Sequence, residues 1–162
     1  MTHVTIMCDG GYTKVQIAGH AGFGYDNGFE EGHDIVCAAV SMLGQTLAQC
    51  MMDMSEQKKV VLNTLGFKPG NIHIRAVARN DCISEMETML KTIAVGYRLL
   101  STAHPEYVQL GCWIRERISG MVYAYGEASL ALGKDREKND SRERPWKGEE
   151  HEKMVETESE NV

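Results

Sequence analysis

Two residues that could serve as a nucleophile and a base, His20 and Cys37, lie on either side of a glycine-rich loop. His20 ends a stretch of alternating apolar and polar residues, as a strand does, and Cys37 follows Asp34, where a helical pattern begins. An imidazole can stabilise a thiolate as an ion pair and later protonate the departing amine. The pair therefore indicates a cysteine hydrolase, provided that the fold brings the two side chains together.

The start of the predicted helix favours this chemistry at Cys37. Asp34 is a good N-cap, because its carboxylate can accept an otherwise unpaired backbone N–H. The first turn of a helix carries a partial positive charge that favours a nearby anion. Its unpaired N–H groups could also bind the oxyanion of a tetrahedral intermediate.

Plainer roles for these residues have to be weighed. A cysteine flanked by Val36 and Ala38 is usually a small core residue, and a strand-end His20 can simply hydrogen-bond to a turn. A metal site could gather His20, His33 and Cys37, but it lacks a convincing fourth ligand. We therefore expect neither a metal nor a cofactor.

The loop from residue 21 to residue 33 has the composition of a lid. Its glycines keep a segment mobile, which suits a loop that orders over a substrate. Its aromatic side chains could pack on apolar substrate residues, or they could be incidental in a solvated loop. The candidate substrate-loop residues are Gly22, Phe23, Tyr25, Phe29 and Gly32.

Three more polar residues lie close to this region in the sequence. Ser41 falls one helical turn beyond Cys37, so it could hydrogen-bond near the site or only pack the helix. Glu30 and Glu31 could attract basic residues of a substrate, although exposed charges are usually just solvated.

The elements that must position these residues follow from periodicity. Strands are predicted at residues 3–8, 12–18, 58–64, 71–78 and 107–110, and helices from Asp34 to about residue 56 and from a cap at Asn80 or Asp81 to a stop before Pro105. The order is β-β-α-β-β-α-β. Hairpins imply a mostly antiparallel sheet, and two amphipathic helices should cover one face, which makes the fold α+β.

Composition changes along the 162 residues of the chain. Residues 1–112 read as one domain with a real core. Residues 113–132 could add a strand or a partner-binding segment, and the pattern does not decide. Residues 133–162 are dense in charge and poor in large apolar side chains, so we expect a disordered tail.

Charge and cysteine usage exclude several classes of protein. The net charge of -6 gives no bulk support for direct nucleic-acid binding, although a local basic patch stays open. Five scattered cysteines do not indicate a disulfide framework. With no evident signal peptide and no apolar run of membrane-span length, we expect a cytoplasmic protein with no membrane partner.

The segments Gly19-His20-Ala21-Gly22 and Gly32-x-Asp34-Ile35-Val36-Cys37-Ala38-Ala39-Val40-Ser41 resemble the signature of the Prp family, the bacterial ribosomal-processing cysteine proteases. The similarity covers roughly the first 110 residues. It implies a homodimeric Cys–His endopeptidase whose substrate is the N-terminal extension of large-subunit ribosomal protein twenty-seven. Cys37 would be the nucleophile, His20 the general base and acid, and Asp34 the group that caps the helix and holds the loop.

The chain departs from the family pattern in two places. The loop between His20 and Cys37 is longer than is usual in the family, and the charged tail is foreign to it. A related protease that processes a phage capsid or scaffold protein is therefore an alternative. A catalytically silent, dimeric binding module of the same fold is a third hypothesis, and the presence of both His20 and Cys37 argues against it.

Overall fold

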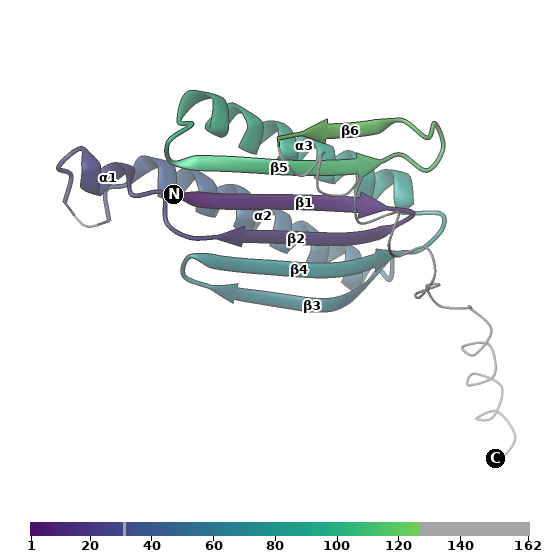
Figure 1. The fold of residues 1–162 in the computed structure, drawn as a ribbon. Helices are drawn as coiled ribbons and strands as arrows, with labels where there is room; N and C mark the ends of the chain where they lie inside the picture. The colour runs from purple at the N-terminus through teal and green to yellow at the C-terminus, as the bar shows by residue number, and fades with distance from the viewer. Residues whose placement is uncertain (31, 127–162) are drawn as a thin grey trace, which may run out of the picture. The chain divides into compact units, whose positions relative to one another are not determined.

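A computed structural model describes residues 1–30 and 32–126, and the tail predicted for residues 133–162 lies outside them. The described chain forms one six-stranded sheet with helices on one face (Figure 1). Its elements are β1 (Thr2–Asp9), β2 (Tyr12–Ala18), α1 (Phe23–Asp26), α2 (Ile35–Glu56), β3 (Val60–Lys68), β4 (Asn71–Ala78), α3 (Ile83–Ala103), β5 (Val108–Arg115) and β6 (Val122–Tyr125). The α+β class and the predicted order are confirmed, with α1 and β6 added.

The strands lie in the order β3-β4-β2-β1-β5-β6. Every neighbouring pair is antiparallel except β1 and β5, which run parallel. The mostly antiparallel sheet is thus confirmed. The parallel pair arises because α3 carries the chain across one face before β5 begins, as parallel connections require.

The core lies between the sheet and helices α2 and α3. Alternation along the strands buries Ile6, Ile17 and Ile74 on the helical face, where they meet Leu47 of α2 and Tyr97 of α3. The Tyr97 hydroxyl donates to the carbonyl oxygen of Val40 at 3.0 Å, which satisfies a buried polar group between the two helices.

Helix α2 is long and apolar enough, by length and composition, to cross a membrane, contrary to the expectation that no apolar run has that length. Its apolar stripe is nevertheless used inside the protein, since Val36, Val40, Leu47 and Met51 are buried. Such a helix is typical of a domain core.

Several element boundaries differ from those predicted, and β5 continues to Arg115 instead of ending at residue 110. Helix α3 begins at Ile83 with Cys82 as its N-cap, because the Asp81 carboxylate is engaged by the Arg79 guanidinium at 2.8 Å instead of capping the helix. Strand β3 continues to Lys68 through the glycine predicted to open a turn. A register shift between Leu62 and Thr64 keeps the strand paired with β4 until the turn.

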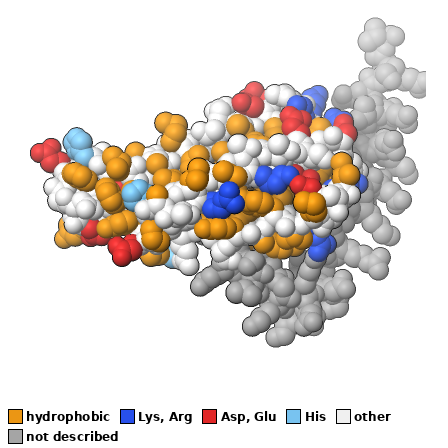
Figure 2. Space-filling view, turned by 90° about the horizontal axis from the view of Figure 1, so that it is seen from above, with side chains coloured by type: hydrophobic (Ala, Val, Ile, Leu, Met, Phe, Trp, Pro, Cys, Tyr) orange, Lys and Arg blue, Asp and Glu red, His pale blue; other side chains and the backbone are white. Residues whose placement is uncertain are grey.

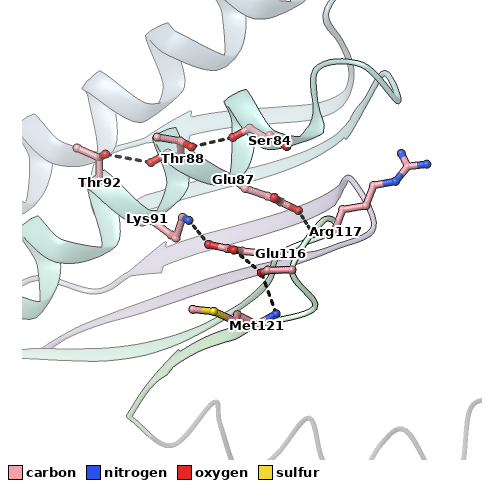
Figure 3. A network of polar contacts seen from close by, with 9 residues as sticks. Ser84, Glu87, Thr88, Lys91, Thr92, Glu116, Arg117 and Met121 are labelled. Atoms are coloured by element: carbon pink, nitrogen blue, oxygen red, sulfur yellow. Dashed lines mark hydrogen bonds and ion pairs between the residues drawn. The ribbon is translucent and has the colours of Figure 1, made fainter.

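A polar network at the start of α3 holds the connection between β5 and β6 (Figure 3). Glu87 is almost fully buried and accepts the backbone N–H of Arg117 at 2.9 Å. Lys91 pairs with Glu116, whose other carboxylate oxygen accepts from the Ser119 hydroxyl. The network places β6 beside β5, in the segment whose structure the sequence left open.

Candidate active site

The end of β2 presents His20 from a rigid backbone. Gly19 turns the chain after Ala18 at a φ of 95°, and a Cβ there would lie 2.5 Å from the carbonyl oxygen of Met1. Only glycine fits such a position. The Gly19 N–H also donates to the Gly70 carbonyl oxygen at 2.9 Å. The residue before the exposed His20 is therefore tied to the turn between β3 and β4.

The turn between β3 and β4 forms the seat of the His20 imidazole. Gly70 has a φ of 68°, and a Cβ built on it would lie 2.6 Å from Nε2 of His20. The imidazole therefore lies directly against the Gly70 backbone, in space that any other residue would fill. Pro69 and Gly70 were predicted as a turn, but nothing in the sequence pattern indicated this contact.

Cys37 lies in the first turn of α2 and is half-buried. Its sulfur accepts the backbone N–H of Ala21, with 3.1 Å between nitrogen and Sγ. Because Ala21 follows His20 directly, this hydrogen bond ties the strand-end segment to the helix that carries the cysteine. It also directs a donor at the atom that would carry the negative charge of a thiolate.

Asp34 caps α2, as predicted, and also holds the loop. One carboxylate oxygen accepts the Cys37 N–H at 2.8 Å and the other accepts the Gly24 N–H at 3.0 Å. Partial burial of the carboxyl opposes its ionisation, but the N–H donors outweigh this effect and hold the pKa of Asp34 below its usual value. The carboxylate is therefore charged at neutral pH.

The capping arrangement changes one expectation about the first turn of α2. The Cys37 N–H donates to the Asp34 side chain and the Ala38 N–H donates to the Asp34 carbonyl oxygen. Both groups already have acceptors, so the predicted use of unpaired first-turn N–H groups for an oxyanion does not apply to them. The Ala21 N–H also has an acceptor, but that acceptor is the Cys37 sulfur itself, which gives up its negative charge when it bonds to the substrate, so this donor can turn to the oxyanion.

The glycine-rich loop contains more structure than its composition suggested. It forms α1, and the Phe23 ring packs edge-on against His104 and Tyr107, with centroids 5.3 and 5.2 Å away. Phe23 thus anchors the loop to the end of α3 and the start of β5. Tyr25 is 90% exposed and Phe29 is 50% exposed, so these two aromatic side chains are open to a ligand.

Two adjoining depressions share the walls formed by His20, Cys37, Ser41, Pro69 and Gly70. The smaller has a volume of about 240 Å³ and includes apolar side chains. The larger, of about 750 Å³, opens toward the loop. The fold therefore brings the predicted nucleophile and base to one surface.

The remaining candidates are distributed between the loop and its anchor. Gly22, Tyr25, Phe29, Gly32 and Asp34 line the larger depression, whereas Phe23 lines neither. The sequence did not identify Phe67 of β3, Ile72 of β4 or the intervening turn residues Pro69 and Gly70 as site residues, because they reach the site only through the strand order.

His33 is exposed and lines neither depression. Within residues 1–30 and 32–126, no three side chains of the metal-binding types are grouped to hold an ion.

Comparison with known proteins agrees with this geometry. The family model described as "Cysteine protease Prp" matches residues 1–109. The chain belongs to the Prp family of cysteine proteases. Among curated proteins, no significant match to the chain was found.

Two solved structures of a Prp protease resemble the chain. One is the essential ribosomal processing protease Prp from S. aureus with a covalently linked product peptide, which is 26% identical with a TM-score of 0.55. The same protease with a substrate peptide is 22% identical with a TM-score of 0.50. Each match covers 69% of this chain and 99% of the other, so the Prp fold accounts for about two thirds of the sequence.

Proposed function

We propose that this Prp-family protease removes the N-terminal extension of large-subunit ribosomal protein twenty-seven, with Cys37 as nucleophile and His20 as general base and acid. The observation that carries the proposal is the hydrogen bond from the Ala21 N–H to Cys37 Sγ. It joins the backbone beside His20 to the sulfur, in depressions that both side chains line. The ribosomal processing activity named for the S. aureus relative supports the choice of substrate.

In the first half of the reaction, the thiol proton of Cys37 passes to the His20 imidazole and the sulfur attacks the scissile carbonyl carbon. The carbonyl oxygen becomes an oxyanion, for which the Ala21 N–H supplies a donor. As the intermediate collapses, the C–N bond breaks and the imidazolium gives its proton to the departing amine. A thioester between Cys37 and the new carboxyl-terminal residue remains.

In the second half, the neutral imidazole takes a proton from a water molecule whose oxygen attacks the thioester. The second intermediate releases the peptide acid and the sulfur, which recovers the proton from the imidazolium. His20 thus acts as base and acid in turn. In the described residues, it makes no hydrogen bond to a carboxylate, so the machinery proposed is a dyad.

The walls of the depressions suggest which substrate residues they accept. Ile17, Val40 and Phe67 line the smaller one, whose volume of about 240 Å³ suits one apolar side chain. Acidic side chains gather at the end of the molecule where α1 lies (Figure 2), and exposed residues there include Asp26 and Glu30. We expect basic residues to flank the scissile bond.

The test is intact-mass analysis of full-length ribosomal protein twenty-seven after incubation with the protease. We expect loss of one defined N-terminal peptide with wild type, and no loss with Cys37→Ala or His20→Ala. A Ser41→Ala variant tests whether the hydroxyl that lines both depressions takes part, and activity equal to that of wild type would mean that cleavage does not need it.

Two other outcomes would assign the chain differently. If wild type leaves the ribosomal protein intact while Cys37 alkylates rapidly at neutral pH, the substrate lies elsewhere, for example in a phage capsid or scaffold protein. A slow thiol together with no cleavage would favour a binding module. The same preparation, analysed by sedimentation, tests the homodimer that the resemblance implies, and fractionation of host cells tests the cytoplasmic location.

A further inference from the structure

The face of the sheet opposite α2 and α3, which we call the outer face, carries a polar hollow between β2 and β4. Both helices lie behind the sheet in Figure 1 and cover its other face. Strand alternation buries Thr13, Val15 and Ile74 under the helices and turns their neighbours toward the outer face. The hollow has a volume of about 230 Å³, and the neighbours that line it include Lys14, Gln16, His73 and Arg75.

Two of these side chains are cations that oppose folding. Lys14 of β2 lies directly opposite Arg75 of β4. Like charges in this arrangement destabilise a sheet, because their Cβ atoms are only about 5 Å apart. In the part of the chain that the structure describes, neither Lys14 nor Arg75 forms an ion pair with a carboxylate. The two cations do not protect a sheet edge either, since β2 and β4 both lie inside the sheet. An uncompensated pair of this kind indicates a site for an anion.

Two further donors lie beside the cations. Gln16 is directly opposite His73, in the next pair along the same face, and its amide and the imidazole can each donate a hydrogen bond. The His73 ring lies across Gly66 of β3, where a Cβ would be only 2.0 Å from Cε1 and 2.8 Å from Nε2. Glycine inside a strand often marks such a close approach. The lack of a side chain at Gly66 therefore gives His73 its place at the edge of the hollow.

We propose that this hollow binds a phosphate dianion, either inorganic phosphate or the terminal phosphate of a small phosphorylated molecule. One dianion would neutralise both cations at once, whereas a carboxylate or a phosphodiester carries a single negative charge. The Arg75 guanidinium can bind two phosphate oxygens side by side. Lys14, Gln16 and His73 can donate to the remaining acceptors.

The proposed phosphate site adjoins the protease site without using its catalytic pair. Asn71 lines both the hollow and the smaller depression, whereas His20 and Cys37 line only the two depressions. The proposal therefore does not depend on the identity of the cleaved protein. A variant that loses phosphate binding should keep both catalytic side chains in place.

The test is an NMR titration of the full chain with inorganic phosphate, glycerol phosphate and dimethyl phosphate, followed through the backbone amides. At about pH 8 a phosphate monoester is a dianion, because its second pKa is about 6. We expect both dianions to shift the signals of residues 14–16 and 73–75 until they saturate. Dimethyl phosphate, with a single charge, should bind about 10-fold more weakly, because it leaves one cation without a counter-charge. Tighter binding of glycerol phosphate would identify the ligand as a phosphorylated molecule, and tighter binding of inorganic phosphate would identify it as the free ion.

Two double variants locate the site. Lys14→Gln/Arg75→Gln should bind inorganic phosphate at least about 10-fold more weakly than wild type, because it loses both hydrogen bonds to charged donors. The matched control is Lys58→Gln/Arg98→Gln, which removes the same charge from the segment before β3 and from α3. It should bind phosphate like wild type.

A stability measurement separates a lost site from a lost fold. Without phosphate, Lys14→Gln/Arg75→Gln should unfold at a higher urea concentration than wild type, because it removes a repulsive pair. The proposal is overturned if neither dianion gives a saturable shift in wild type, if both double variants lose affinity equally, or if acetate binds as tightly as phosphate. That last result would assign the hollow to carboxylates.

Discussion

The backbone of Gly70 is the surface on which the His20 imidazole lies, so a side chain there would move the proposed base. In Gly70→Ala, the new methyl group would occupy the space now held by Nε2, which is 2.6 Å from that position. Displacement of a catalytic group by about 1 Å can reduce a rate by about 100-fold, and we expect a loss of kcat/KM of that order. Peptide cleavage measures it.

A matched variant separates displacement from backbone strain. Gly10 also has a positive φ, of 56°, but a Cβ there would meet nothing within 4 Å. Gly10→Ala should therefore carry the left-handed strain of about 1–2 kcal/mol without touching the site. Equal loss of activity in the two variants would contradict the seat proposed for His20.

Asp34 links the stability of the protein to pH through its two N–H donors. The pKa of its carboxyl is lower in the folded protein than in the unfolded chain, where it is about 3.9. Its ionised form therefore stabilises the fold above about pH 4, and this contribution is lost as the pH falls through the folded-state pKa. Asp34→Asn removes the titration and leaves one oxygen for two donors.

We expect Asp34→Asn to lower the free energy of unfolding at neutral pH by about 1 kcal/mol, because one of the two N–H donors loses its acceptor. The difference between wild type and variant should shrink as the pH falls below about 4. Urea unfolding at a series of pH values measures both quantities. A difference that stays constant over that range would mean that the Asp34 charge contributes nothing.

Helix α1 and its loop depend on the contact between Phe23 and the ends of α3 and β5. Phe23→Ala removes the ring that packs on His104 and Tyr107, so we expect residues 22–30 to exchange their amide hydrogens faster and KM to rise more than kcat falls. Tyr25→Ala is the control, because a side chain that is 90% exposed should change stability by less than about 0.5 kcal/mol. Unchanged exchange in Phe23→Ala would contradict the anchor.

The connection between β5 and β6 depends on one buried carboxylate. In Glu87→Ala the Arg117 N–H loses its acceptor, and the loss of a hydrogen bond to a charged group costs about 1.5–3 kcal/mol. This end of the sheet lies opposite the end that carries His20 and Cys37 (Figure 1), so peptide cleavage by the folded variant should be unchanged. Urea unfolding and activity assays on the same sample check both statements, and a stability equal to that of wild type would contradict them.

The helices and strands could be predicted because each has its own period of apolar residues. Which elements lie side by side in the fold could not be predicted. Apolar spacing placed α2, and the residue types of His20 and Cys37 indicated their chemistry. The seat at Gly70 depends on β4 lying beside β2, which local pattern does not encode. Likewise, the bulk charge gave no support for nucleic-acid binding and left a local basic patch open, because a sum over the chain does not show that alternation gathers cations on one face of the sheet.

The distribution of charge over the whole molecule predicts how salt affects the proposed reaction. The end that carries α1 and the depressions is acidic (Figure 2), and opposite charges attract a substrate over a Debye length of about 10 Å at 0.1 M salt. We expect kcat/KM for a peptide with lysines beside the scissile bond to fall about 10-fold when the salt is raised to about 1 M, where that length is about 3 Å. For an otherwise identical peptide with glutamines in place of the lysines, kcat/KM should fall much less.

Asp26→Asn/Glu30→Gln should remove most of the difference between the two peptides, because these exposed carboxylates would supply the attraction. If the two peptides respond equally to salt in wild type, the acidic end does not select the substrate, and the apolar walls formed by Ile17 and Val40 would have to provide the selectivity.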